Sequence, residues 1–361
     1  MAVASPDQGQ LEIGLASTPG EVDACEEVIR LGFGRVMRLG LESEVDERRV
    51  LTTLYCLETR SKRIVATSRL VSLDYLGRSE ALVKEYRIGS VPTELRGRSL
   101  LSFQSAALPD QRGTEVMSRL FQGCWEYGIA GGYLLTVSAC KPYLFPYFMS
   151  MGFRPYERAY VSSEGGYRIP IVLLHYDQEY LRACRSPFAS VLPVTHEVPG
   201  ASAAKAWFDQ SCPAPKSLNV RIITRPEQID FDLNFFRGLS EATIHSIFRY
   251  AVEITCELGD QLIREKAPEH VIGFVLHGSV DVVKGERKIG TLKSGAIFGE
   301  VSFLLQVPRT ASLLAATEDT RIAFISVRSL DAIKDPAEAS VFWRNLSGHL
   351  AAKLQQSTEL L

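Results

Sequence analysis

The stretch GAIFGEVSFLLQVPRTAS, residues 295–312, decides the interpretation of the C-terminal half of this chain. Gly299 allows the backbone to approach a neighbouring group closely. Glu300 opens the apolar run VSFLL, which predicts a short helix whose first amides are available to an anion. Arg309 follows Pro308 and carries a planar guanidinium that binds two phosphate oxygens at once. These residue types suit a buried phosphate, because a buried charge must be paired and hydrogen-bonded.

The sequence around this stretch predicts a small β-rich domain closed by a helix. Residues 271–292, VIGFVLHGSVDVVKGERKIGTL, alternate apolar and polar positions between glycines, which is typical of an antiparallel barrel or jelly roll. Residues 238–254, GLSEATIHSIFRYAVEI, begin with Ser240 and Glu241 and have helical apolar spacing. A strand over 254–258 and a turn at Gly259 follow.

The closing helix is predicted over residues 336–356. Its apolar stripe is expected at Phe342, Leu346, Leu350 and Leu354.

Residues 295–312 closely resemble the phosphate-binding cassette of cyclic-nucleotide-binding domains, and the resemblance extends over roughly residues 230–355. It implies that Arg309 binds the cyclic phosphate and that Glu300 accepts a hydrogen bond from the ribose 2′-hydroxyl. The alternative is a related barrel that binds no ligand. Cyclic AMP and cyclic GMP both stay open as the ligand, because Thr310 is compatible with either. The implied contact residues are Phe298, Gly299, Glu300, Val301, Ser302, Arg309, Thr310 and Ala311.

In relatives the closing helix covers the base, so Phe342 or Trp343 is a candidate for stacking on the purine, with plain packing as the alternative.

Composition restricts the remaining possibilities. The 361 residues suit two domains, and 46% hydrophobic with 23% charged residues is typical of a soluble globular protein. A net charge of −2 argues against nucleic-acid binding, and no long apolar run predicts a membrane span. The N-terminus does not resemble a signal peptide, and no helix-turn-helix is expected before Leu361. Seven scattered cysteines and six dispersed histidines predict reduced thiols in the cytoplasm and no metal site.

A linker separates the two predicted domains. Residues 186–220 are rich in Pro, Ala and Ser and have no sustained periodicity, apart from one short helix expected around 204–208. The sequence therefore predicts a first domain over 1–185, a linker over 186–225 and a second domain over 226–361.

The sequence of the first domain predicts a mixed α/β fold. Strands are expected in residues 11–18, 51–73 (two strands joined at Arg60–Lys62), 99–108, 132–140 and 167–176. Helices are expected in residues 20–37 and 114–130, with a shorter one within 141–152.

This order of elements resembles the GNAT N-acyltransferase fold over roughly residues 10–180, so the fold class expected is α/β, a GNAT-like mixed sheet with flanking helices, followed by an α+β cyclic-nucleotide-binding jelly-roll barrel. Two stretches carry the resemblance: AALPDQRGTEVMSRL, residues 106–120, and PYFMSMGFRPYE, residues 146–157. The first implies binding of an acyl-CoA or acyl carrier protein thioester, although Glu115 and Met117 replace the usual small residues. The implied donor-binding residues are Ala107, Leu108, Arg112, Gly113 and Thr114.

The second stretch implies a tyrosine that protonates the leaving thiolate. The family's tyrosine aligns with Phe148, so its neighbour Tyr147 is the candidate acid, and Glu85, acting through water, is the candidate base. Arg30, Phe33 and Arg69 give a further resemblance to acyl-homoserine-lactone and N-acyl amino acid synthases.

Two functional interpretations follow from the sequence. The first is an N-acyltransferase regulated by a cyclic nucleotide, with a protein lysine, an amino acid or another amine as acceptor. The second is a cyclic-nucleotide sensor in which a degenerate acyltransferase fold serves as a non-catalytic effector module.

Overall fold

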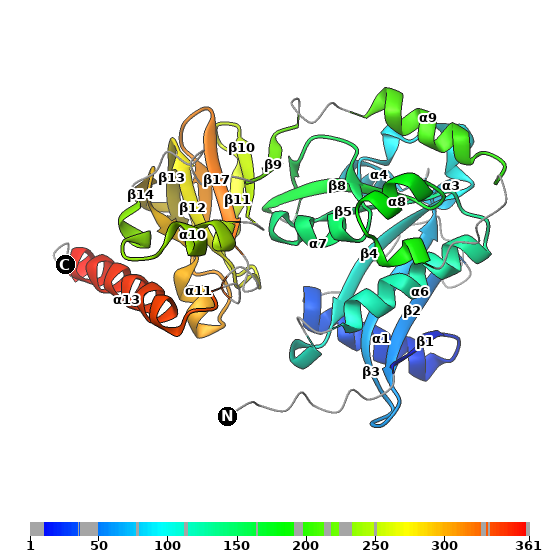
Figure 1. Ribbon diagram of the computed structural model, residues 1–361, viewed down its shortest axis with the longest axis horizontal. Coiled ribbons are helices and arrows are strands. Elements are labelled where there is room, and N and C mark those ends of the chain that lie inside the picture. Colours follow the sequence, from blue (N-terminus) through cyan, green and yellow to red (C-terminus); the bar gives the residue numbers. More distant parts are fainter. Residues whose placement is uncertain are drawn as a thin grey trace. The chain divides into compact units, whose positions relative to one another are not determined.

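The computed structural model describes residues 11–34, 36, 50–76, 79–111, 115–163, 165–190, 198–212, 218–223, 233–248, 251–325, 330 and 333–358. The chain divides into two compact units (Figure 1). The N-terminal unit comprises 1–139, 149–156 and 170–212, and the C-terminal unit comprises 140–148, 157–169 and 213–361. Two short segments of the first half of the sequence therefore belong to the C-terminal unit. The domain boundaries drawn from the sequence stay a prediction.

An eight-stranded mixed sheet is the frame of the first half of the described chain, in the order β1-β2-β3-β4-β5-β8-β6, with β7 beside β8. Only β4 and β5 among the recorded neighbouring pairs run parallel. The strands are β1 (Leu11–Leu15), β2 (Leu51–Glu58), β3 (Arg63–Ser72), β4 (Ser99–Ala107), β5 (Leu135–Cys140), β6 (Arg154–Pro155), β7 (Tyr160–Val161) and β8 (Tyr167–Leu174).

Helices cover both faces of this sheet (Figure 1). On one face, α1 (Pro19–Phe33) and α6 (Val116–Ala130) share a core with β2, β3 and β4. On the other face, α3 (Leu73–Leu76), α4 (Glu80–Glu85) and α9 (Ala201–Ser211) pack around Leu101, Phe103 and Val137. The helix expected in the linker is thus α9, and its Trp207 belongs to this second core. The shorter helices are α5 (Thr93–Arg96), α7 (Phe145–Ser150) and α8 (Gln178–Ala183).

The C-terminal unit contains two antiparallel sheets, as the sequence predicts. One has the order β15-β12-β17-β10-β9 and the other β11-β16-β13-β14. Their strands are β9 (Val220–Ile222), β10 (Val252–Cys256), β11 (Gln261–Ile263), β12 (Ile272–His277), β13 (Ser279–Lys284), β14 (Arg287–Lys293), β15 (Ile297–Phe298), β16 (Ser312–Ala315) and β17 (Thr320–Ile325). The predicted fold class is confirmed.

Besides residues 145–148 of α7, the described part of this unit contains the α-helices α10 (Glu241–Phe248), α11 (Glu300–Leu305) and α13 (Pro336–Thr358). The helix predicted over 238–254 was too long, because residues 252–254 pair with β17 and β9 as part of β10. The aromatic core of the unit joins the 3₁₀ turn Leu233–Phe236, α10, β12 and the first half of α13.

The predicted stripe of α13 is right at its start and wrong at its end. Phe342 and Leu346 are fully buried in this core, whereas Leu354 is 69% exposed.

No described helix is long and apolar enough to cross a membrane. No cluster of metal-ligating side chains occurs among the described residues.

Candidate functional site

The predicted phosphate cassette is a tight turn between β15 and α11. Gly299 has φ +81°, in the left-handed region, and forms the N-terminal cap position of α11. A Cβ atom at this position would collide with the guanidinium of Arg309 and the carbonyl of Val271. Only glycine therefore fits between the two halves of the cassette. The short helix expected after Gly299 is α11.

Arg309 is buried against the backbone of this turn, at 4% exposure. Its Nη2 donates to the carbonyl of Val271 at 2.9 Å, and its Nη1 donates to the carbonyl of Gly299 at 3.3 Å. Its Nε is buried with no hydrogen-bond partner among the described residues. A buried donor without a partner costs about 1–3 kcal/mol, and an anionic oxygen is the group that satisfies it best.

Glu300 is the first residue of α11 and is 5% exposed. Its Oε1 accepts a hydrogen bond from Lys353 Nζ of α13 at 2.7 Å. Lys353 Nζ also donates to the carbonyl of Ile297 at 2.8 Å. The carboxylate that the resemblance assigns to the ribose is thus paired with a lysine 53 residues further along the chain.

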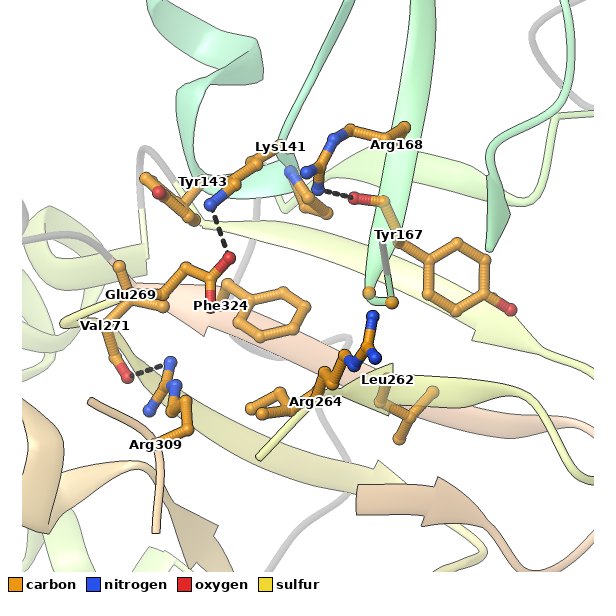
Figure 2. A pocket seen from close by; sticks show the side chains of 14 residues that line it. Lys141, Tyr143, Tyr167, Arg168, Leu262, Arg264, Glu269, Val271, Arg309 and Phe324 are labelled. Carbon is orange, nitrogen blue, oxygen red and sulfur yellow. Dashed lines mark hydrogen bonds and ion pairs between the residues drawn. The ribbon is translucent and has the colours of Figure 1, made fainter. Parts of the chain in front are cut away.

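Arg309 also lines a small pocket of the C-terminal unit, together with Lys141 and Glu269 (Figure 2). Lys141 forms an ion pair with Glu269 there. Burial opposes the charge of Glu269, but Lys141, Arg309 and Arg168 hold the pKa of that carboxyl below its usual value. Burial also lowers the pKa of the Arg309 guanidinium, and Glu269 opposes that shift. Glu269 is therefore an electrostatic partner of Arg309 although the two form no recorded ion pair.

The other predicted nucleotide residues line the same turn. Phe298 is buried and meets the Phe324 ring edge-on, with 5.9 Å between centroids. Ser302 is buried, and its hydroxyl donates to the carbonyl of Pro308 at 3.4 Å. Thr310 is exposed, and Val301 and Ala311 are half-buried. All eight lie in one continuous cassette, and their contacts with a nucleotide stay a prediction.

Both aromatic candidates on α13 pack against protein in this structure. Phe342 meets Phe235 edge-on at 5.4 Å between centroids, and the Trp343 ring stacks on Phe303 at 6.4 Å.

The N-terminal unit has an opening between two strands of its sheet, β4 and β5. The two strands pair only from Ser99↔Leu135 to Leu101↔Val137 within the described residues, while β4 continues along β3 as far as Ala107. Just past the last pair, Ser138 Oγ donates to the carbonyl of Ser102 at 2.8 Å. Within the described residues, no backbone pairing of β4 with β5 is recorded beyond this bridge, and the opening is this unpaired stretch, whose residues Ser102 to Gln104 are buried.

A bulge in β4 lies beside the opening. Gln104 has φ +48°, and the register between β3 and β4 shifts there. Arg69 Nη1 donates to Gln104 Oε1 at 3.1 Å, and the Arg69 guanidinium lies 5.3 Å from the Phe103 ring centroid. Bulges re-aim backbone and side chains and are frequent near active sites. Arg69 is thus a buried part of the strand framework.

The predicted donor residues are only partly within the described chain. Ala107 and Leu108 are buried at the end of β4, and the Leu108 amide already donates to the Val65 carbonyl at 2.9 Å. That amide is engaged within the sheet, which leaves Ala107 as the candidate for polarising a thioester. Arg112, Gly113 and Thr114 lie outside the described residues. Glu115 is exposed at the start of α6, and Met117 packs on the core beneath it.

The predicted acid and base come from separate units. Tyr147 is half-buried on α7, within residues 140–148 of the C-terminal unit, and Glu85 ends α4 in the N-terminal unit. Both stay predictions. Cys140 is buried, and burial raises the pKa of its thiol, as expected of a packing residue.

Sequence comparison identifies the domain class of the C-terminal unit. Residues 253–335 match the family model of the cyclic nucleotide-binding domain. The regulatory subunit of cAMP-dependent protein kinase from Hypocrea atroviridis is 32% identical over 80 residues, which is 22% of this chain and 17% of that protein. The chain thus spans less than a fifth of the curated relative it matches. The cyclic-nucleotide-binding domain predicted from residues 295–312 is confirmed.

Solved structures similar to each half of the chain are also known. A cyclic nucleotide-binding domain from Methylobacillus flagellatus is 21% identical, with a TM-score of 0.35, over 40% of this chain and 88% of that one. The N-acyl amino acid synthase FeeM from uncultured soil microbes is 13% identical, with a TM-score of 0.40, over 51% of this chain and 99% of that one. Escherichia coli ElaA is 11% identical, with a TM-score of 0.33, over 45% of this chain and 99% of that one.

The partners of the cassette were not foreseen from the sequence. Lys353, Glu269 and Lys141 are far from the cassette in sequence and reach it through tertiary packing. Of these three residues, only Lys353 could have been predicted from the neighbouring sequence, because it lies on the buried face of the closing helix.

Proposed function

We propose that this protein is an N-acyltransferase whose activity responds to a cyclic nucleotide. The acyl group would come from a thioester of CoA or of acyl carrier protein. The acceptor would be an amine, namely a protein lysine, an amino acid or another small amine. The nucleotide would be cAMP or cGMP, and the protein kinase relative gives some weight to cAMP.

The observation that carries the nucleotide half of the proposal is the arrangement of Gly299, Glu300 and Arg309. A guanidinium with one unsatisfied buried donor, a buried carboxylate and a glycine that admits no side chain meet in one turn. The first group suits a cyclic phosphate, the second a ribose hydroxyl and the third a close approach of the sugar. In a barrel without a ligand, Arg309 would bond the two backbone carbonyls but leave its buried Nε without a partner.

The opening between β4 and β5 supports the acyl-transfer half. An extended pantetheine arm carries amide groups, and an open strand edge offers the backbone partners for them, as for an added strand. The opening ends near Ala107, where a backbone amide would polarise the thioester carbonyl. Tyr147 as the acid and Glu85 as the water-mediated base belong to the same proposal.

One observation favours the second candidate, a sensor without catalysis. Glu115 occupies the start of α6, where a pyrophosphate would need uncharged amides. If the donor is CoA, Glu115→Gly should strengthen its binding. If the donor is an acyl carrier protein that delivers only the arm, the change should matter little.

Ligand-induced stabilisation tests both halves together. Ligands that bind only the native state raise its stability, so unfolding should be followed with cAMP, cGMP, acetyl-CoA, a long-chain acyl-CoA and an acyl carrier protein thioester. The proposal expects stabilisation by a cyclic nucleotide and by one thioester, and release of thiol when an amine is added. Stabilisation by nucleotide alone, with no thiol released from any thioester, would leave the sensor as the better description.

A further inference from the structure

The second half of α13 brings a cation to the carboxylate of the cassette. Lys353 Nζ donates to Glu300 Oε1 at 2.7 Å and to the Ile297 carbonyl at 2.8 Å. The Glu300 side chain is 6% exposed and the Lys353 side chain 32%. The pair is therefore half-shielded from water, so its attraction is screened less than that of a surface ion pair.

The apolar anchors of α13 lie before this pair. Phe342 and Leu346 are buried in the aromatic core, but Leu350 is half-buried and Leu354 is 69% exposed. His349, one turn before Lys353, is half-buried, and burial together with the Lys353 charge lowers its pKa. The recorded contact of these turns with the cassette, made by Lys353, is therefore polar, while the His349 ring lies edge-on to Phe235 of the core with 6.5 Å between centroids.

We infer that Lys353 is a built-in competitor of the ribose and that it couples occupancy of Glu300 to release of the last turns of α13. This inference rests on the proposed nucleotide function. A ribose 2′-hydroxyl that bonds to Glu300 takes the place of the ammonium, and Lys353 leaves Glu300 and Ile297 together. Because no described side chain of α13 after Leu346 is a fully buried apolar group, residues 347–358 then detach while the rest of the helix stays.

Hydrogen exchange of the full-length protein tests the release. Lys353→Met keeps the aliphatic stem and removes the charge, and Arg344→Met changes an exposed cation of the same helix as the control. Without added nucleotide, Lys353→Met should speed amide exchange in residues 347–358 at least three-fold, and Arg344→Met should not. Saturating cAMP should speed exchange in the wild type at the same residues. Equal exchange in all three proteins overturns the inference.

Calorimetry separates the competitor role from a supporting role. Lys353→Met should tighten binding of cAMP by about three- to ten-fold, the effect of removing a half-buried charged hydrogen bond from the competing state. It should change the affinity for 2′-deoxy-cAMP less than two-fold, because that ligand makes no bond to Glu300. Equal or weaker cAMP binding by Lys353→Met overturns the inference while the nucleotide function stands. Absence of cAMP and cGMP binding in both proteins overturns the nucleotide function itself and the inference with it.

Discussion

Arg309 is held by two backbone carbonyls, and no carboxylate forms a recorded ion pair with it. A nucleotide phosphate would place an anion in direct contact with the guanidinium and accept a hydrogen bond from its Nε. Arg309→Ala should therefore weaken cyclic-nucleotide binding by about 2–4 kcal/mol. Arg309→Lys should recover only part of this loss, because an ammonium lacks the planar fork. Titration calorimetry with cAMP and cGMP measures both, and unchanged affinity in Arg309→Ala would remove Arg309 from the site.

Glu300 should determine the preference for ribose over deoxyribose. Glu300→Gln is expected to lower the ratio of cAMP to 2′-deoxy-cAMP affinity more than it lowers affinity for the shared phosphate. Glu253→Gln is the matched control, because Glu253 is also a buried carboxylate paired with arginines, Arg221 and Arg321. An unchanged ratio in Glu300→Gln would show that Glu300 does not bind the ribose and serves only packing or the contact with α13.

His175 makes the stability of the N-terminal unit depend on pH. It is fully buried between the Thr136 hydroxyl and the Tyr133 carbonyl, and burial lowers its pKa to about 4. Between pH 6.5 and 4 the unfolded chain binds a proton that the folded unit does not, so stability falls as pH falls, by up to ~3 kcal/mol. Denaturant unfolding from pH 7.5 to 4.5 should show this slope, and His175→Gln should flatten it. A wild-type slope as flat as that of the variant would contradict the assignment.

At the scale of elements, the turn between β15 and α11 depends on Gly299. Gly259 has nearly the same backbone conformation, φ +85° against +81°, but a Cβ there meets nothing within 4 Å. Gly259→Ala should therefore cost only conformational strain, about 1 kcal/mol. Gly299→Ala should cost more, because its Cβ collides with Arg309 and Val271, and should abolish nucleotide binding. Similar unfolding free energies and intact binding in both variants would show that the turn accommodates a side chain.

The local sequence pattern was sufficient to predict the elements whose apolar residues follow a regular helical or strand spacing. The strands β1 to β5 and β8, the helix α6 and the cassette follow from alternation, glycine positions and residues close together in the sequence. The end of α10 could not be predicted in this way, because Val252 and Ile254 suit a helical face and become strand residues only through pairing with β17 and β9.

The stripe of α13 shows why a spacing of four is a poor guide over a long helix. At about 100° per residue, twelve residues place Leu354 about 120° away from Phe342, whereas eleven place Lys353 within about 20° of it. Lys353 therefore faces the cassette and Leu354 faces solvent. The ion pair of Lys141 with Glu269 spans 128 residues and had no local signal.

At the scale of the whole molecule, α13 should be necessary for communication between the nucleotide site and the acyl-donor site. Removal of the whole helix after Asp335 would open the aromatic core, because Phe342 and Leu346 complete it. A chain that ends at Gly348 retains both anchors and lacks Lys353. We expect this chain to bind nucleotide and donor but to lose the effect of each on the other. Full coupling in the shortened chain would assign the communication to another element.

The most direct test of the account is the affinity for an acyl-thioester donor, and the rate of acyl transfer from it, with and without saturating cAMP or cGMP. Linkage requires nucleotide and donor to change each other's affinity by the same factor, and coupling of ~1–3 kcal/mol corresponds to about five- to 150-fold. We predict a change of this size in the wild type and none in Arg309→Ala. A wild-type protein that binds a cyclic nucleotide and a thioester but shows the same donor affinity and rate with and without nucleotide would contradict the account.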